Sequence, residues 1–142
     1  MTTFVHIFRV RYHETDPQRF VFNSRYLEYA DVAMTEYFRH LGWDYPELLE
    51  LGFDPSLVAT QIEFLRPATL DESLKMHVRC SKIGTSSTEL RFELTRNDQT
   101  LSVIHSTYVN VDLRTGRATP IPTAIAAALT ADRTTSDGEL EQ

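Results

Sequence analysis

The sequence predicts an α+β protein in which one long helix is combined with an antiparallel β-sheet. Three features predict this class: an alternating segment at residues 4–12, a stretch of apolar residues at helical spacing after it, and four strand-like segments beyond residue 56. The 142 residues are enough for one domain with one hydrophobic core. We therefore expect a single domain over residues 1–131 and a polar, disordered tail over residues 132–142.

The first two predicted elements are a strand and a long helix. Aromatic and β-branched residues alternate with other residues over 4–12, which is typical of a strand. Apolar side chains over 26–41 then follow helical spacing. Asn23 or Ser24 can cap the start of this helix, and Gly42 suits its end. The apolar stripe of the helix is broad, so we expect a curved sheet to pack against it.

The rest of the chain predicts a short helix, four strands and a second short helix. The first short helix covers residues 44–51 and stops at Gly52. Pro, Gly and Asn-Asp turns separate the four strands, which are expected over residues 57–66, 73–83, 86–96 and 100–113. A turn over 114–117 and a short helix over 122–131 complete the domain.

Composition and charge exclude several classes of protein. The net charge of -6 and the isoelectric point near 5.3 exclude a general attraction to nucleic acid or anionic lipid. Cys80 is the one cysteine, so no intrachain disulfide can form, and no His/Cys cluster has the spacing of a zinc site. The N-terminal segment lacks the pattern of a signal peptide, and no run of eighteen apolar residues occurs. We expect a cytoplasmic protein with no metal site, no nucleic-acid partner and no membrane insertion.

Asp16 is the candidate for chemistry, because the sequence offers few others. No G-x-S-x-G motif or phosphate-binding glycine pattern is present. An Asp before a Pro is a common turn element, and taken alone Asp16 fits that structural role. Asp16 also precedes a helix start, where unpaired N–H groups can hold a carbonyl oxygen that gains negative charge. A carboxylate beside such a site can catalyse acyl transfer to water as a nucleophile or as a general base.

Three segments of the sequence carry a resemblance to a known family. They are RVRYHETDPQRFVFNSRYLEYADVAMTEYFRHLGW at 9–43, IEFLRPATLDESL at 62–74 and SKIGTSSTELRFEL at 81–94. In this order they resemble the hotdog-fold acyl-CoA thioesterases of the 4-hydroxybenzoyl-CoA thioesterase family, including the short-chain enzymes associated with the Tol-Pal system. The similarity covers most of residues 4–113. It implies a hotdog fold, in which a curved antiparallel β-sheet wraps a long central helix.

The resemblance implies an acyl-CoA thioesterase that hydrolyses an acyl-CoA thioester to a carboxylic acid and free CoA, without a metal or redox cofactor. Asp16 matches the family's catalytic carboxylate, as nucleophile or general base. Asn23 matches the helix-start residue whose backbone N–H points at the thioester oxygen, and Ser24 lies beside it. The family also implies a homodimer or a dimer of dimers, with paired active sites at the subunit interface.

Further substrate-binding residues are implied in two places, a strand that usually faces the partner's site and a turn commonly near the pantetheine and nucleotide of CoA. The strand contributes Val58, Ala59, Thr60 and Gln61, and the turn contributes Gly84, Thr85, Ser86 and Ser87. Arg66, Arg79 and Lys82 can neutralise CoA phosphates or can be solvated surface charges. The roles of the individual side chains at these positions are left open.

The sequence departs from the family at Arg19 and Phe20, where many relatives have Gly-His or Gly-Val. Losing the glycine narrows the freedom of the backbone. Arg19 also adds a cation near the expected acyl pocket, where it can pair with Asp16 or Glu14, recognise an acidic or polar acyl group, or point to solvent. We expect these two positions to decide which substrate this protein uses.

Other interpretations fit parts of the same pattern. A helix-grip binding module binds an apolar molecule without converting it chemically, but it normally has more strands and a long C-terminal helix. A cone-shaped α+β isomerase or cyclase usually begins with helices, and a hotdog dehydratase generally places a His with an acidic partner in its site. A hotdog scaffold without activity is a further alternative, since fold alone does not establish activity.

Overall fold

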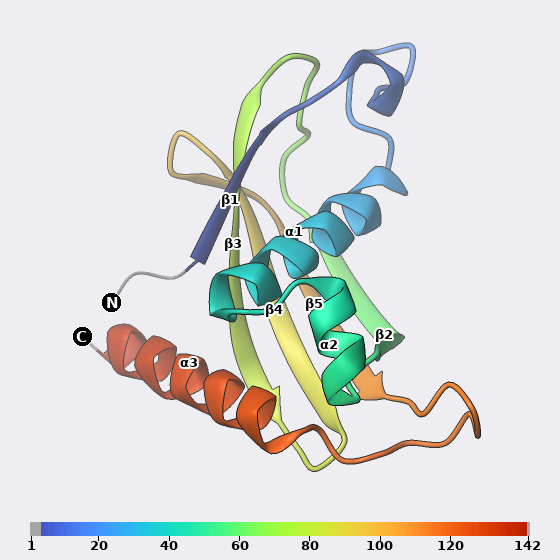
Figure 1. The fold of residues 1–142 in the computed structure, drawn as a ribbon. Coiled ribbons are helices and arrows are strands. Elements are labelled where there is room, and N and C mark those ends of the chain that lie inside the picture. The colour runs from blue at the N-terminus through green and yellow to red at the C-terminus, as the bar shows by residue number, and fades with distance from the viewer. Residues whose placement is uncertain (1–3, 142) are drawn as a thin grey trace.

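The computed structural model describes residues 4–141, with side chains described as far as Arg133. It contains a five-stranded antiparallel sheet and three α-helices, which confirms the predicted α+β class (Figure 1). In chain order the elements are β1 (Phe4–Arg9), the 3₁₀ turn η1 (Tyr12–Glu14), α1 (Arg25–Leu41), α2 (Tyr45–Leu51), β2 (Pro55–Phe64), β3 (Ser73–Ile83), β4 (Ser87–Arg96), β5 (Gln99–Asn110) and α3 (Thr123–Glu141).

The sheet has the strand order β1-β3-β4-β5-β2, so that β1 and β2 are its two edges. All neighbouring strands are antiparallel. The register of the three central strands places Val78, Phe92 and Ile104 next to one another on the buried face. Less buried residues alternate with them along β3 and β4, as expected for strands with one face in the core. Most residues of β2 are exposed, because this strand lies at an edge.

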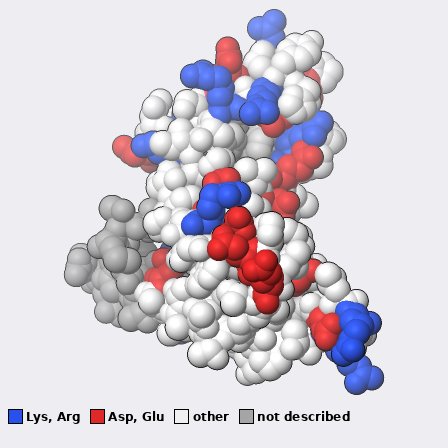
Figure 2. Space-filling view, viewed as in Figure 1, with Lys and Arg blue, Asp and Glu red and all other residues white. Residues whose placement is uncertain are grey.

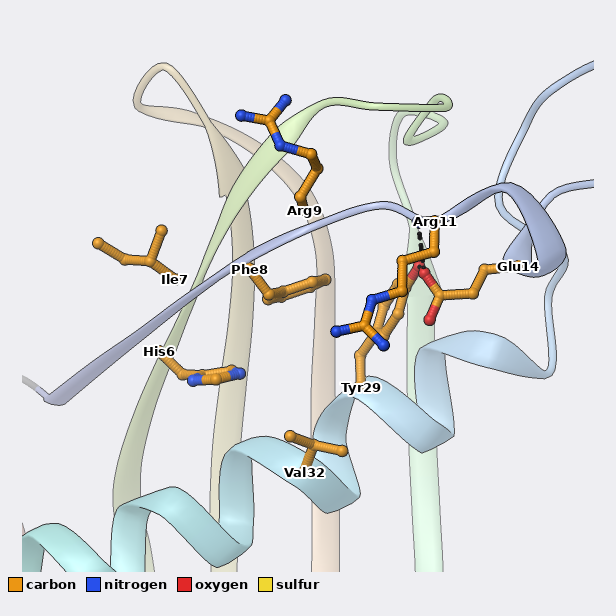
Figure 3. A pocket seen from close by; sticks show the side chains of 8 residues that line it. All are labelled: His6, Ile7, Phe8, Arg9, Arg11, Glu14, Tyr29 and Val32. Atoms are coloured by element: carbon orange, nitrogen blue, oxygen red, sulfur yellow. Dashed lines mark hydrogen bonds between the residues drawn. The ribbon is translucent and has the colours of Figure 1, made fainter.

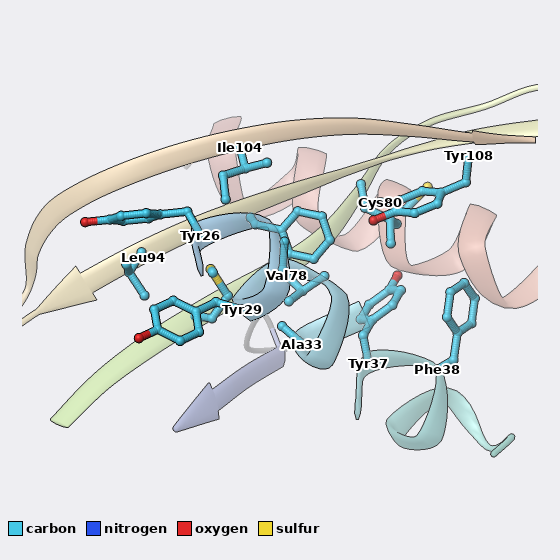
Figure 4. Packing of buried hydrophobic residues seen from close by; sticks show 14 of the residues in the cluster. Tyr26, Tyr29, Ala33, Tyr37, Phe38, Val78, Cys80, Leu94, Ile104 and Tyr108 are labelled. Carbon is cyan, nitrogen blue, oxygen red and sulfur yellow. The ribbon is translucent and has the colours of Figure 1, made fainter. Parts of the chain in front are cut away.

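Helix α1 lies across one face of the sheet and forms much of the core with it (Figure 1). Its buried side chains recur at helical spacing, as the sequence predicts. In Figure 4, Tyr26, Tyr29, Ala33, Tyr37 and Phe38 of α1 pack with Val78, Cys80, Leu94, Ile104 and Tyr108 of the sheet. Burying a large apolar side chain contributes about 1.5–3 kcal/mol. The packing of this face therefore holds α1 on the sheet, with residues 23 and 24 just before its first turn.

Several element boundaries differ from those predicted. The first strand ends at Arg9 rather than at residue 12, because Tyr12–Glu14 form the turn η1. The last strand ends at Asn110, whose side-chain amide donates hydrogen bonds to the carbonyls of Gly52 (3.0 Å) and Pro120 (3.1 Å). These bonds tie the strand end to two loops that sequence periodicity does not connect. Gly42 does end α1 as predicted, with φ of 127°.

Helix α3 is longer than the predicted helix over 122–131. It begins at Thr123 and continues through Glu141, beyond the start of the segment expected to be a disordered tail. Ile125 and Leu129 bury one side of it. Asp132 then accepts hydrogen bonds through Oδ2 from the hydroxyl of Tyr37 (2.7 Å) and from the backbone N–H of Cys80 (2.9 Å). These contacts join residues 95 and 52 positions apart, so a polar local sequence cannot reveal them.

The surface carries charges of both signs. Lys and Arg side chains are interspersed with Asp and Glu side chains over the face drawn in Figure 2, and most of that face is uncharged. Within residues 4–141, no helix has the length and apolar composition needed to cross a membrane.

Candidate active site

The loop between η1 and α1 folds back on itself around Asp16. Asp16 Oδ1 accepts hydrogen bonds from the backbone N–H groups of Gln18 (2.8 Å) and Phe20 (3.2 Å). The backbone of Asp16 also donates to the carbonyl of Phe20 and accepts from the N–H of Arg19, both at 2.8 Å. Asp16 therefore has the structural role of a turn residue. No donor within the described part of the chain binds its second carboxylate oxygen, Oδ2, so this oxygen is free for chemistry.

Two sets of contacts hold this loop at one end of the sheet. On one side, the N–H of Val21 donates to the carbonyl of Ala68 (2.9 Å), and the N–H of Leu70 donates to the carbonyl of Arg19 (3.0 Å). On the other side, Glu14 Oε1 accepts hydrogen bonds from the hydroxyl of Tyr29 in α1 (2.9 Å) and from the backbone N–H of Arg11 (2.7 Å). The loop is thus fixed both to the segment before β3 and to α1.

The pKa of Tyr29 is raised by its surroundings. Its burial in the core disfavours the phenolate and raises its pKa, and the hydrogen bond to the Glu14 carboxylate raises the pKa further. A neutral hydroxyl remains a hydrogen-bond donor over the physiological pH range. The link between α1 and the segment that leads to Asp16 is therefore maintained at neutral pH.

Asp16 and Asn23 line the same cleft, of about 280 Å³. The cleft lies between the loop, the start of α1 and the end of β2, and its other lining residues are Phe20, Val21, Tyr26, Phe64, Leu65, Arg66 and Pro67. The rings of Tyr26 and Phe64 meet edge to face, with centroids 5.0 Å apart. The cleft thus combines a carboxylate and a helix start with an apolar, partly aromatic wall.

The start of α1 has backbone N–H groups that are free to bind a ligand. The N–H groups of Arg25 and Tyr26 donate to the carbonyls of Phe22 (2.9 Å) and Asn23 (3.3 Å). For the N–H groups of Asn23 and Ser24, residues 4–141 supply no acceptor. Ser24 occupies the N-cap position but makes no side-chain cap hydrogen bond, so the predicted side-chain cap is wrong. Two uncapped amides at the positive end of a helix can stabilise a developing oxyanion.

The structure separates the remaining predicted site residues into three places. Arg19 is exposed, has a left-handed backbone with φ of 70°, and is absent from the residues that line the cleft, whereas Phe20 lines it. The strand residues Val58, Ala59, Thr60 and Gln61 are exposed on the edge strand β2 and do not line the cleft of their own chain. Their predicted contact with substrate stays a prediction.

The third place is the turn between β3 and β4. Lys82, Gly84, Thr85, Ser86 and Ser87 lie in or beside this turn. The antiparallel register pairs Arg9 with Ser73, so the Asp16 loop follows the opposite end of β3. An eleven-residue strand such as β3 spans about 35 Å. Within one chain the turn is therefore remote from Asp16, and its contact with CoA also stays a prediction.

The residues that sequence reasoning missed are Tyr26, Val21, Leu65, Phe64 and Pro67. Three of them belong to the segment FLRP at residues 64–67, where exposed apolar residues precede a proline at a strand end. Such a run is a weak signal for a binding wall. Only the packing of this segment against the Asp16 loop identifies it as part of the cleft. In the described part of the chain, no group of three or more His, Cys, Asp or Glu residues could hold a metal ion.

Comparisons with known proteins identify the family and the fold of this chain. A family model described as the thioesterase-like superfamily matches residues 10–129. The acyl-CoA thioesterase YbgC of Haemophilus influenzae is 31% identical over 123 residues, which cover 84% of this chain and 89% of that protein. A crystal structure of a hypothetical protein from Aquifex aeolicus superimposes with a TM-score of 0.83, at 22% identity, over 89% of this chain and 98% of the other.

A second structure is that of a thioesterase from Thermus thermophilus in complex with coenzyme A and Zn. It superimposes with a TM-score of 0.78 at 26% identity, and the match covers 92% of this chain and 93% of that protein. The family model spans nearly the whole domain, including the Asp16 loop, α1 and all strands from β2 to β5. The chain therefore belongs to the thioesterase-like superfamily of hotdog proteins, as its three sequence motifs predict.

Proposed function

We propose that this protein is an acyl-CoA thioesterase whose reaction takes place in the cleft between Asp16 and the start of α1. The observation that carries the proposal is that the free Oδ2 of Asp16 and the uncapped helix start at Asn23 belong to one cleft. The membership of the family and the activity named for the Haemophilus relative support the same reaction class.

Two routes are consistent with this arrangement. In the first, Asp16 Oδ2 attacks the thioester carbon, the C–S bond breaks to release the CoA thiolate, and water hydrolyses the resulting anhydride. In the second, Asp16 removes a proton from water as the water attacks the carbonyl. In both routes the carbonyl oxygen gains negative charge, which the N–H groups of Asn23 and Ser24 would stabilise. Neither route needs a metal or redox cofactor.

Replacing Asp16 by Asn tests the assignment. The amide side chain of the Asp16→Asn variant keeps an oxygen acceptor for the N–H groups of Gln18 and Phe20, so we expect the loop to retain its fold. The neutral amide can neither attack the thioester nor accept a proton, and kcat for acyl-CoA hydrolysis should fall by at least about 10²-fold. Steady-state release of free thiol from a panel of acyl-CoAs provides the measurement.

Asp71→Asn is the matched control, because it removes the same charge from an exposed residue of the neighbouring loop that does not line the cleft. Its kcat should stay within about twofold of the unmodified protein. Near-normal hydrolysis by Asp16→Asn would refute the catalytic role of Asp16. Binding of acyl-CoA without any turnover by the unmodified protein would instead favour the non-catalytic binding module.

We also propose a homodimer formed through the free edge of β2. This edge is ten residues long and exposes Leu57 and Val58, at 48% and 58% of their surface. An uncovered apolar edge strand readily pairs with another strand. A twofold axis would pair two β2 strands antiparallel, and the Asp16 end of one sheet would then lie at the same end as the 84–87 turn of its partner. This arrangement would bring the predicted CoA-binding turn to the cleft of the neighbouring chain.

Val58→Lys tests the dimer, because a charge on an edge strand opposes pairing. We expect this variant to sediment as a monomer in analytical ultracentrifugation at micromolar concentration. Ile7→Lys, at a similarly exposed position on the other edge strand, should remain a dimer. An unmodified protein that sediments as a monomer, or an unchanged oligomer in Val58→Lys, would exclude pairing through β2.

A further inference from the structure

A second hollow lies between β1 and α1 (Figure 3). Its volume is about 400 Å³, and it shares no lining residue with the cleft. We call it the β1–α1 groove, and its walls comprise His6, Ile7, Phe8, Arg9, Arg11, Glu14, Tyr29 and Val32. Neither the family model nor the proposed reaction assigns a role to it.

The floor of the groove consists of aromatic rings. The ring centroids of Phe8 and Tyr29 lie 4.6 Å apart. The imidazole of His6 stacks on the ring of Phe8, with centroids 5.6 Å apart and an interplanar angle of 16°. Ile7 and Val32 are apolar and exposed at 61% and 52%, so they present hydrocarbon at the mouth of the groove. A flat, apolar molecule can bury one face on such a surface by offset stacking.

Arg11 supplies the polar group of the groove. In Figure 3 its side chain extends into the groove toward Tyr29 and Val32. Arg9 is different, because its Nη1 donates to the carbonyl of Asp71 (2.6 Å). Glu14 is also engaged, since its Oε1 accepts from Tyr29 and from the backbone of Arg11. Within the described residues the guanidinium of Arg11 has no hydrogen-bond or ion-pair partner.

We infer that the β1–α1 groove binds an aromatic carboxylate, with the carboxylate on Arg11 and the ring on the partly exposed rings of His6 and Phe8, which pack on the buried Tyr29. A guanidinium pairs with a carboxylate through two parallel hydrogen bonds, and the fork of Arg11 is the free donor set here. The aromatic rings at the floor of the groove favour a planar apolar ligand over a sugar or a peptide chain. A volume of about 400 Å³ lies in the range of small-molecule sites.

The inference is tested by titration with 2-naphthoate and with the neutral 2-naphthamide. NMR of methyl groups labelled with ¹³C reports the place of binding, because Ile7 and Val32 line the groove and Leu65 lines the cleft. We expect 2-naphthoate to shift the Ile7 and Val32 methyl signals in a saturable way, with at least about tenfold higher affinity than 2-naphthamide. Equal affinity for the two probes would overturn the inference. So would the absence of any shift of these methyl signals at a probe concentration of about 10 mM, which is high enough to reveal weak binding.

Two substitutions locate the binding energy. Arg11→Gln keeps the backbone N–H that binds Glu14 but removes the guanidinium, and the affinity for 2-naphthoate should fall about tenfold. Val32→Trp fills the mouth of the groove and should abolish the saturable shift at Ile7. Arg39→Gln, an exposed position near the other end of α1, should bind as the unmodified protein does.

The Asp16→Asn variant separates this inference from the proposed reaction. Its groove is unchanged, so 2-naphthoate should bind it normally even if hydrolysis is lost. A carboxylate could also enter the cleft as a product analogue, and shifts at Leu65 that survive Arg11→Gln would identify such binding. If all saturable shifts fall on Leu65 and none on Ile7 or Val32, the groove is not a carboxylate site.

Discussion

At the scale of single residues, Arg19 has a backbone conformation that favours glycine. Its φ of 70° lies in the left-handed region, which residues with a side chain rarely adopt and which favours glycine. The conformation is imposed by the turn, in which the N–H of Arg19 donates to the carbonyl of Asp16 and its own carbonyl accepts from Leu70. The sequence shows an arginine at this position, but only the structure shows that its backbone is left-handed.

Arg19→Gly should therefore raise the stability of the protein. A left-handed backbone costs a residue with a side chain about 1–2 kcal/mol, and the greater freedom of glycine in the unfolded chain offsets part of the gain. We expect the free energy of unfolding in urea to rise by about 0.5–1 kcal/mol. Arg19→Ala removes the same charge but keeps the strain, so its stability should not rise. Equal stabilities of the Gly and Ala variants would contradict the account of strain.

At the scale of elements, the partly buried carboxylate of Asp132 links α3 to the core, in addition to the buried side chains of Ile125 and Leu129. Tyr37 is fully buried in α1, and its hydroxyl donates to Asp132 Oδ2, which also accepts the N–H of Cys80 in β3. One side chain thus joins α3 to both α1 and the sheet. Among residues 4–141, the pairing of β1 with β3 extends from Ser73 to Val78, and the N–H of Cys80 lies beyond it.

Tyr37→Phe should weaken this attachment by removing a hydrogen bond to a charged group. Such bonds contribute about 1.5–3 kcal/mol, and we expect a loss of this size in the free energy of unfolding. Tyr45→Phe is the control, because its hydroxyl binds Asp54 on the exposed surface at 3.0 Å. It should cost less than about 1 kcal/mol. Similar losses in the two variants would show that Asp132 does not anchor α3.

At the scale of the whole molecule, buried tyrosines make stability depend on alkaline pH. Burial raises the pKa of Tyr29, Tyr37 and Tyr108, and for Tyr108 it does so to about 12. Above about pH 10 the unfolded chain releases these protons while the folded chain keeps them. The unfolded state then binds fewer protons, so the free energy of unfolding falls as pH rises.

We expect these tyrosines to cause no change in the free energy of unfolding in urea below about pH 9. From about pH 10 upward they should lower it. Each tyrosine contributes a slope of up to about 1.4 kcal/mol per pH unit, and the contribution of Tyr108 is complete above its folded pKa of about 12. Tyr108→Phe should reduce the slope between about pH 10 and 12. An unchanged slope in this variant would mean that Tyr108 already ionises normally in the folded protein.

The element order of this protein follows from its sequence alone. The spacing of apolar residues predicts α1, the short helix α2 and the four strands after residue 55, because helical and strand periods are local properties. The turn at Asp16 and the helix end at Gly42 are also local, since each depends on the chemistry of one or two residues. The three family motifs are also local stretches of sequence, and their order along the chain predicts the superfamily that the family model identifies.

Tertiary structure alone decides which of these local features meet. Asp16 and Asn23 share a cleft with Phe64 and Leu65 because the loop pairs with the segment before β3 and α1 packs across the sheet. The antiparallel register moves the 84–87 turn to the far end of the sheet, away from Asp16. The guanidinium of Arg11 faces the groove because of the same packing. Long-range contacts have no period in the sequence, so the site and the groove appear only when the chain is folded.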